Sequence, residues 1–378
     1  MHARSWLPPL LVTIALASQA CGSRTGPLED EVLSGASRDG GLAGDGGLKP
    51  LACTPGQFKL SRASGQLVFT IDRSGSMRLT LDGQQATPSR PSRWTVLGDA
   101  LTPVLASLEA NIEVGAKFFP ARIDNPSAVD PITACVVDSA VDVLPAKGGS
   151  EKILDVFRST SPGGGTPTSD ALRAAATYLS APERRSIARY IVLATDGGPN
   201  CNAGIGNPGT CVCTTTDPTA CRTSRDGQYS CLDDVRTIAT VRDIAGKQKI
   251  PTYVLGLGDP GRPEFVDTLD AMAVAGERPR AEKPFYYDIR TPDQLGSALA
   301  SIQKSISRCS FVTPSRPDHP DAIAITVDGK AVVRDRAQGW EWIDRDFGQI
   351  EFFGDICAAL ATSGEAPNVS ATVTCNTN

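Results

Sequence analysis

Two short apolar segments, each followed directly by a polar cluster with an aspartate, constrain the fold more than any other feature of this chain. Residues 66–71 (QLVFTI) precede Asp72, and residues 190–194 (YIVLA) precede Thr195 and Asp196. Unbroken apolar runs of this length are typical of strands that are covered on both faces, as in a parallel sheet. We therefore expect buried strands that end at polar residues on one edge of a sheet.

Segments with helical periodicity alternate with apolar runs along the chain. The further expected strands are residues 112–119, 252–257 and 285–289, and the expected helices are residues 93–109, 152–157, 167–179, 235–245, 265–273 and 293–307. Strands that alternate with helices form βαβ units, in which the helices cover the sheet. The pattern predicts an α/β fold with a doubly wound, mostly parallel, Rossmann-like sheet.

Two regions depart from this alternation. Residues 200–234 hold five cysteines and little apolar content, which predicts a disulfide-stapled insertion. After Cys309 the pattern changes to short strands with a hairpin signal at residues 328–329 (DG), which predicts a small all-β module. We therefore place the α/β domain, with its insertion, at residues 51–308 and the β module at residues 309–378.

The N-terminal 20 residues have the pattern of an export signal, with Arg4 before an apolar stretch too short to span a membrane. Cys21 follows a small residue, as at a bacterial lipoprotein cleavage site, and would become a lipid-modified N-terminus that anchors the chain to a membrane. Plain secretion with cleavage after residues 15–17 is the alternative. Residues 21–50, rich in Gly, Ser and Asp, predict a flexible tether. We expect an exported protein of the bacterial cell envelope, as an outer-membrane lipoprotein or otherwise secreted.

The cysteines indicate an oxidising compartment. Of the 11 cysteines, removal of Cys21 leaves an even set of ten that is expected to pair as disulfides. These are Cys53, Cys135, Cys201, Cys211, Cys213, Cys221, Cys231, Cys309, Cys357 and Cys375. Because five of them lie in the insertion, at least one must pair outside it, and Cys135 is a candidate. A zinc site in the insertion is the alternative, although the paired C-x₂-C spacing of such sites is missing.

Charge and histidine content argue against several classes of function. The chain has 37 Lys and Arg against 42 Asp and Glu, and therefore lacks the basic surplus of a nucleic-acid binder. His2 lies in the expected leader, so His319 would be the only histidine of the mature chain. With a single histidine in the expected mature chain, the sequence argues against Ser-His or Cys-His catalysis.

Three polar clusters lie at or near the ends of expected strands: residues 72–76 (DRSGS), 163–168 (GGGTPT) and 195–198 (TDGG). Because the crevice of an open α/β sheet forms at the carboxyl ends of its strands, we expect the clusters to meet there. Their carboxylates and hydroxyls are hard oxygen ligands, which suit Mg²⁺ rather than zinc or copper. Taken singly, each cluster is more typical of a turn or a helix cap, and only the agreement of all three in order, spacing and sheet edge favours a site.

The order D-R-S-G-S, G-G-T-P-T, T-D-G resembles a von Willebrand factor type A (VWA) domain with a complete metal-ion-dependent adhesion site. The resemblance covers about residues 58–307. It implies that Ser74 and Ser76 bind the metal through their hydroxyls and that Thr166 binds directly or through water. Asp72 and Asp196 would act mainly through bridging waters.

The resemblance further implies Mg²⁺, or else Mn²⁺ or Ca²⁺, as the ion. A protein partner would offer a carboxylate to the remaining coordination position. The Cys-rich insertion directly after Asp196 and the β module both depart from the family pattern. The insertion could shape, shield or replace the usual partner surface.

An enzyme is the main alternative class. Residues 256–261 (GLGDPG) fit G-x-G-x-x-G after a strand, but Arg262 and Pro263 interrupt the helix that a dinucleotide site needs. The sequence contains neither a G-x-S-x-G nucleophile elbow nor a P-loop. We therefore predict a non-enzymatic cell-envelope lipoprotein that binds a protein partner through a divalent cation. A VWA scaffold with a structural or unused metal site and, less favoured, a Mg-dependent hydrolase are the alternatives.

Overall fold

The computed structural model describes residues 49–109, 112–122, 130–215, 219–223, 227–258, 261–362 and 368–376. The expected signal peptide, Cys21 and nearly all of the expected tether lie outside these residues. Within them, no helix has the length and apolar character needed to cross a membrane.

A six-stranded sheet with the order β5-β4-β3-β6-β7-β8 forms the centre of the α/β domain. The strands are β3 (Gly65–Asp72), β4 (Ile112–Phe119), β5 (Val143–Ala146), β6 (Ala188–Thr195), β7 (Thr252–Leu257) and β8 (Tyr287–Ile289). Neighbours pair in parallel except β5, which is antiparallel to β4 at one edge. Every residue of β3 and β6 is buried, in agreement with their unbroken apolar sequences. The α/β, mostly parallel fold class is confirmed, whereas β5 was not predicted.

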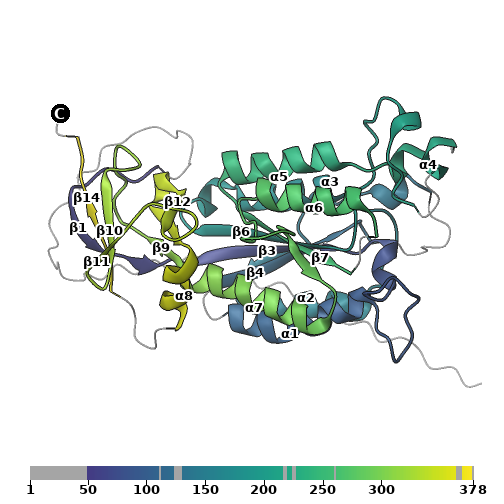
Figure 1. Cartoon of the computed structure of the whole chain (residues 1–378), viewed down its shortest axis with the longest axis horizontal. Coiled ribbons are helices and arrows are strands. Elements are labelled where there is room, and N and C mark those ends of the chain that lie inside the picture. Colours follow the sequence, from purple (N-terminus) through teal and green to yellow (C-terminus); the bar gives the residue numbers. More distant parts are fainter. Residues whose placement is uncertain are drawn as a thin grey trace, which may run out of the picture. The chain divides into compact units, whose positions relative to one another are not determined.

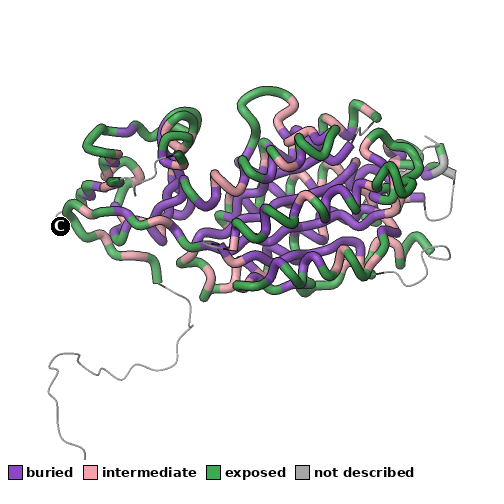
Figure 2. Tube along the Cα trace, turned by 90° about the horizontal axis from the view of Figure 1, so that it is seen from below, coloured by how far each residue is buried: buried purple, intermediate pink, exposed green. Residues whose placement is uncertain are grey.

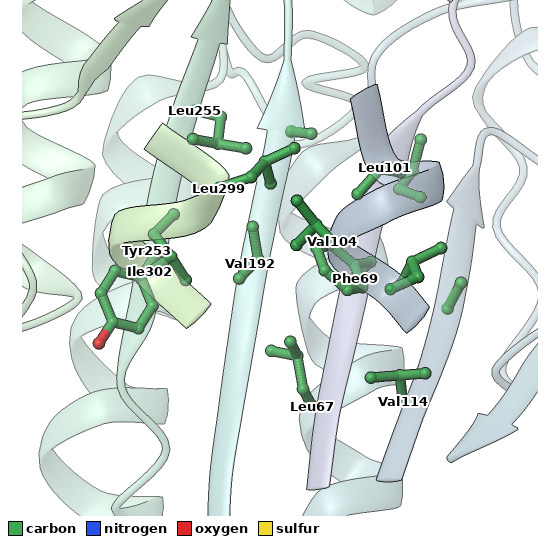
Figure 3. Packing of buried hydrophobic residues seen from close by; sticks show 14 of the residues in the cluster. Leu67, Phe69, Leu101, Val104, Val114, Val192, Tyr253, Leu255, Leu299 and Ile302 are labelled. Atoms are coloured by element: carbon green, nitrogen blue, oxygen red, sulfur yellow. The ribbon is translucent and has the colours of Figure 1, made fainter. Parts of the chain in front are cut away.

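Helices cover both faces of this sheet (Figure 1). One face carries α1 (Arg93–Leu108), α2 (Gly149–Ser159) and α7 (Pro292–Arg308), and the other carries α3 (Thr168–Leu179), α5 (Asp234–Gln248) and α6 (Pro263–Ala275). Because successive side chains of a strand point to opposite faces, β3 contributes Leu67 to the first layer and Val68 to the second. Figure 2 shows the buried residues concentrated along the central strands. In Figure 3, Leu101 of α1 and Leu299 of α7 pack over the first face.

The remaining strands form two four-stranded antiparallel sheets, with the orders β1-β14-β10-β11 and β12-β13-β9-β2. The elements are β1 (Gly56–Lys59), β2 (Ser61–Arg62), β9 (Ser310–Val312), β10 (Ile323–Val327), β11 (Lys330–Val332), β12 (Trp340–Asp344), β13 (Gln349–Phe352), α8 (Gly354–Thr362) and β14 (Val369–Val373). Since β1 pairs with β14 and β2 with β9, the segment before the α/β domain belongs to the β module. The expected boundary at residue 51 is corrected accordingly: the α/β domain begins with β3 and is inserted between two parts of the β module.

Buried ion pairs join the α/β domain to the β module at the amino ends of the parallel strands. Arg189, in β6, lies 3.2 Å from Asp344, and both side chains are less than 5% exposed. Arg278 forms a second buried pair with Glu351 of β13. These pairs link the two parts by contacts that no local sequence pattern indicates.

The ten cysteines of the described residues form five disulfides. The pairs are Cys53–Cys375, Cys135–Cys201, Cys211–Cys231, Cys213–Cys221 and Cys309–Cys357. Cys135 is thus the partner outside the insertion, which also contains the short helix α4 (Ala220–Thr223). Sulfur atoms of three insertion cysteines lie close together, but all of them are in S–S bonds. The insertion therefore offers no thiolate to a zinc ion.

Candidate metal-binding site

The polar clusters after β3 and β6 lie next to each other because these strands are parallel neighbours in the sheet. Asp72 is the last residue of β3, and Asp196 follows β6 directly. Ser76, Thr166 and Asp196 line one cavity of about 380 Å³. The structure thus brings the three predicted clusters together at the carboxyl end of the sheet.

Asp72 is fully buried, and two hydrogen bonds fix its carboxylate. Oδ1 accepts from the N–H of Ser74 (2.7 Å), and Oδ2 accepts from the hydroxyl of Thr195 (2.6 Å). Burial, followed by the nearby carboxylate of Asp196, raises the pKa of Asp72 to about 7, although its hydrogen-bond donors oppose the shift. Within the described ranges, no Arg or Lys forms an ion pair with Asp72. Its negative charge is therefore not compensated by the protein.

The serine hydroxyls connect the first cluster to the third. Ser74 Oγ lies 3.0 Å from Ser76 Oγ, and Ser76 Oγ donates to Asp196 Oδ1 (2.8 Å). Ser74 is buried, whereas Ser76 is exposed at the cavity. Hydroxyl and carboxylate oxygens linked in this way form a hard-oxygen set, which fits a small divalent cation such as Mg²⁺ or Mn²⁺.

Thr166 lies on the loop that leads into α3, and Asn200 holds its backbone. The N–H of Thr166 donates to Asn200 Oδ1 (2.6 Å), and its carbonyl accepts from the N–H of Asn200 (2.9 Å). The same loop is tied to the first cluster, because the N–H of Gly75 donates to the carbonyl of Gly164 (3.0 Å). Asn200 was not among the predicted site residues.

Arg93 is a second residue of the site that the sequence did not reveal. Its Nη1 lies 2.6 Å from Asp196 Oδ2, and both side chains are at most 5% exposed. Burial raises the pKa of Asp196, while Arg93 opposes that shift. Arg93 is the first residue of α1, and its N–H donates to the carbonyl of Leu79 (2.8 Å), which fixes the helix start beside the site. Its partner lies 103 residues away, so no local pattern could have linked the two.

No family model and no curated protein matches this chain. Among solved structures, the PilB minor pilin from Streptococcus sanguinis is 18% identical, with a TM-score of 0.43 over 65% of this chain and 62% of the pilin. The pilus adhesin SpaC from Lactobacillus rhamnosus GG is 16% identical, with a TM-score of 0.45 over 85% of this chain and 41% of SpaC. The vWF domain of the type V pili tip protein Mfa5 from Porphyromonas gingivalis is 10% identical, with a TM-score of 0.41 over 65% of this chain and 96% of that domain.

This chain therefore spans about three fifths of the matched pilin and about two fifths of SpaC. At these identities and TM-scores, the likeness carries no information on ligands or partners. The structure itself shows a mostly parallel sheet with one antiparallel edge strand and helices on both faces.

The Cys-rich insertion contributes to the cavity, in keeping with its position after Asp196. Thr214 and Thr215 of the insertion line the cavity, as do Arg262 and Phe265. Arg262 also donates a hydrogen bond to the carbonyl of Cys213 and so connects the start of α6 to the insertion. Any ligand that enters the cavity would meet side chains of the insertion.

The G-x-G-x-x-G match has a structural explanation. Gly258 has a φ of 83°, in the left-handed region that favours glycine. A Cβ at this position would lie 2.5 Å from the carbonyl oxygen of Leu81 and 2.8 Å from Nε of Arg93. Gly258 thus leaves room for the arginine that pairs with Asp196, and its presence needs no phosphate ligand.

Proposed function

We propose that this chain is an exported cell-envelope protein that binds a partner protein through a divalent cation at a VWA-type adhesion site. Ser74, Ser76 and Thr166 would supply hydroxyl ligands. Asp72 and Asp196 would act mainly through bridging waters and their charge. The bound cation, Mg²⁺ or else Mn²⁺ or Ca²⁺, would supply a coordination position for a carboxylate of the partner.

The convergence of the predicted oxygen donors at the ends of two neighbouring strands is the observation that carries this proposal. Loops at this edge place Ser76, Thr166 and Asp196 around one cavity, and hydrogen bonds between the serine hydroxyls and Asp196 connect the first and third clusters. The buried carboxylate of Asp72 has no protein counter-charge, and a cation beside it would supply one.

The charges of the site also suit an acidic partner. With a cation bound and both carboxylates ionised, Asp72 and Asp196 contribute −2 and Arg93 contributes +1, so these three side chains together carry −1. A dication would leave the assembly at +1. This residual charge would attract a carboxylate from a partner, whereas a site with two unpaired carboxylates would leave none.

The disulfides support export, since five such bonds are typical of a chain that folds in an oxidising compartment. We further propose that Cys21 carries a lipid and that residues 21–50 form a tether between the membrane and the site. Mass spectrometry of the native N-terminus tests this anchor. A mature chain that begins elsewhere, or an unmodified Cys21, would contradict it.

One observation favours a second candidate, a VWA scaffold whose site works without a metal ion. Arg93 already places a positive charge beside Asp196, and Ser76 already donates its hydroxyl to the same carboxylate. Catalysis is less favoured, because among the described residues neither serine hydroxyl contacts an imidazole or an amine that could take its proton.

Metal titration of chelator-treated protein decides between these candidates. By isothermal titration calorimetry, the wild type should bind one Mg²⁺ or Mn²⁺ per chain, and S74A/S76A should bind none. The exposed Ser297 of α7 supplies a matched control, because S297A removes a hydroxyl that belongs to none of the three clusters and does not line the cavity. A wild type that binds neither ion would support the scaffold. Capture of an envelope partner that is lost in EDTA would extend the result to the partner protein.

A further inference from the structure

The loop that carries Thr166 lies against two segments that are far apart in the sequence. On one side, the N–H of Gly165 donates to the carbonyl of Ala134, at 2.9 Å. The next residue, Cys135, forms a disulfide with Cys201, on the other side of the loop. The disulfide therefore joins the two segments between which the loop lies.

The disulfide and Asn200 approach this loop so closely that only glycine fits. A Cβ on Gly165 would lie 2.8 Å from Cys201 Sγ, 3.0 Å from Asn200 Oδ1 and 3.2 Å from Cys135 Sγ. The first of these distances is shorter than real Cβ contacts, so the sulfur atoms lie directly against the backbone next to Thr166.

Asn200 completes the contact and connects it to the insertion. Its Oδ1 accepts from the N–H of Thr166 (2.6 Å), and its Nδ2 donates to the hydroxyl of Thr214 (3.0 Å). The Thr214 hydroxyl in turn donates to the carbonyl of Ser230 (3.0 Å). Because donor and acceptor of the amide both have partners, its orientation is fixed.

Helix α3 by itself does not hold Thr166 in this way. The helix begins at Thr168, and its N-cap residue, Pro167, has no N–H and makes no side-chain cap. Thr166 precedes this cap, and two of its backbone bonds run to Asn200. The position of its hydroxyl therefore depends on groups outside the helix.

We infer that Asn200 and the Cys135–Cys201 disulfide are positioning groups of the metal site, so that the Cys-rich insertion takes part in cation binding. This inference rests on the proposed function, since it gives these groups a role in binding the same cation. Groups that orient a metal ligand without touching the metal typically lower metal affinity by about 10–100-fold when they are removed. Asn200 acts on Thr166 through hydrogen bonds to its backbone, and the disulfide acts through its close approach to the preceding residue, Gly165.

A double-mutant cycle on metal affinity tests Asn200. We expect N200A to weaken Mn²⁺ binding by about 10–100-fold, measured by calorimetry well below the unfolding temperature. The matched control is N202A, since the side chain of Asn202 also forms a hydrogen bond with the backbone, to the carbonyl of Leu232 rather than to Thr166. In a T166A background, N200A should change the affinity by less than about twofold, because its only route to the metal has been removed.

The disulfide is tested by C135S/C201S against C309S/C357S, which removes a disulfide between α7 and α8. Only the first pair should weaken Mn²⁺ binding. If C135S/C201S fails to fold by circular dichroism, the Asn200 cycle still decides the inference.

Three outcomes would overturn the inference. If N200A and C135S/C201S both bind Mn²⁺ as tightly as a wild type that does bind, the proposed function stands and the inference fails. N200A could instead lose as much affinity in the T166A background as in the wild type, which would show an action independent of Thr166. A wild type that binds no divalent cation would overturn the inference together with the proposed function.

Discussion

The two ends of the central sheet bury charge in different ways. At the amino ends of the strands, where the α/β domain meets the β module, each buried carboxylate has an arginine of its own. Asp344 pairs with Arg189, and Glu351 pairs with Arg278. These pairs are closed arrangements that leave no charge for a further ligand.

At the carboxyl ends of the strands, one of two buried carboxylates pairs with an arginine and the other, in the described part of the chain, does not. Arg93 bonds to Asp196, while Asp72 accepts hydrogen bonds from neutral groups alone. An isolated buried charge is expensive unless something compensates it. The fold thus neutralises its buried carboxylates at the amino ends of the strands. At the carboxyl ends, where we propose that a cation binds, it leaves the carboxylate of Asp72 without a counter-charge.

The largest expected effect on stability comes from the amino ends of the strands, called here the closed end because each buried carboxylate is paired. Arg278→Met should lower the free energy of unfolding by about 3–5 kcal/mol, because it leaves Glu351 buried without its counter-charge. The loss should be the same in Mg²⁺ and in EDTA, and urea unfolding measures it. Arg158→Met is the control, since Arg158 forms an exposed pair with Asp155 and should contribute little to stability. Equal losses for the two variants would break the comparison.

The carboxyl ends of the strands, where Asp72 has no counter-charge, form the open end. There, Arg93→Met should lower the free energy of unfolding by about 3 kcal/mol in EDTA, because it leaves the buried carboxylate of Asp196 unpaired. Here saturating Mg²⁺ should recover part of the loss, because the cation supplies positive charge near Asp196. Unfolding in the two buffers checks this difference. A loss that does not depend on Mg²⁺ would make the two ends alike and would favour the metal-free scaffold.

Asp72→Asn should act in opposite directions with and without metal. In EDTA, it should stabilise the protein by about 1 kcal/mol, because a neutral amide removes a buried charge. In Mg²⁺ at 100 times the dissociation constant, it should abolish a stabilisation of about 2.7 kcal/mol. Thermal melts in both buffers measure the two effects, with the exposed Asp155→Asn as control. Retention of the Mg²⁺ stabilisation would remove Asp72 from the site.

The sequence was sufficient for the central strands and for the polar clusters at their ends. β3 and β6 are buried on both faces, so their residues form unbroken apolar runs, and the aspartates mark the points where the runs end. The short edge strand β5 was missed, because its alternating burial and its proline give no such run. β1 was assigned to the wrong part, since its partner β14 lies more than 300 residues away.

Arg93 and Asn200 could not be found in this way for a related reason. Each acts through hydrogen bonds to a loop that is distant in the sequence, and neither stands in a pattern of its own. The cysteine count required one pairing from the insertion to the rest of the chain. It did not indicate that this pairing, Cys135–Cys201, lies against Gly165.

Gly165 supplies the smallest and most local test of the open end. Gly165→Ala would place a methyl group 2.8 Å from Cys201 Sγ, so the loop or the disulfide must move. We expect Mn²⁺ affinity to fall about tenfold, equivalent to about 1.4 kcal/mol, with little change in the unfolding midpoint in EDTA. Gly197→Ala is the matched control, because Gly197 lines the same cavity but a Cβ there would meet no atom within 4 Å. If both variants keep wild-type affinity, Mn²⁺ binding at the open end does not depend on the exact position of the Thr166 loop. The two ends of the sheet would then differ only in how their buried carboxylates are paired.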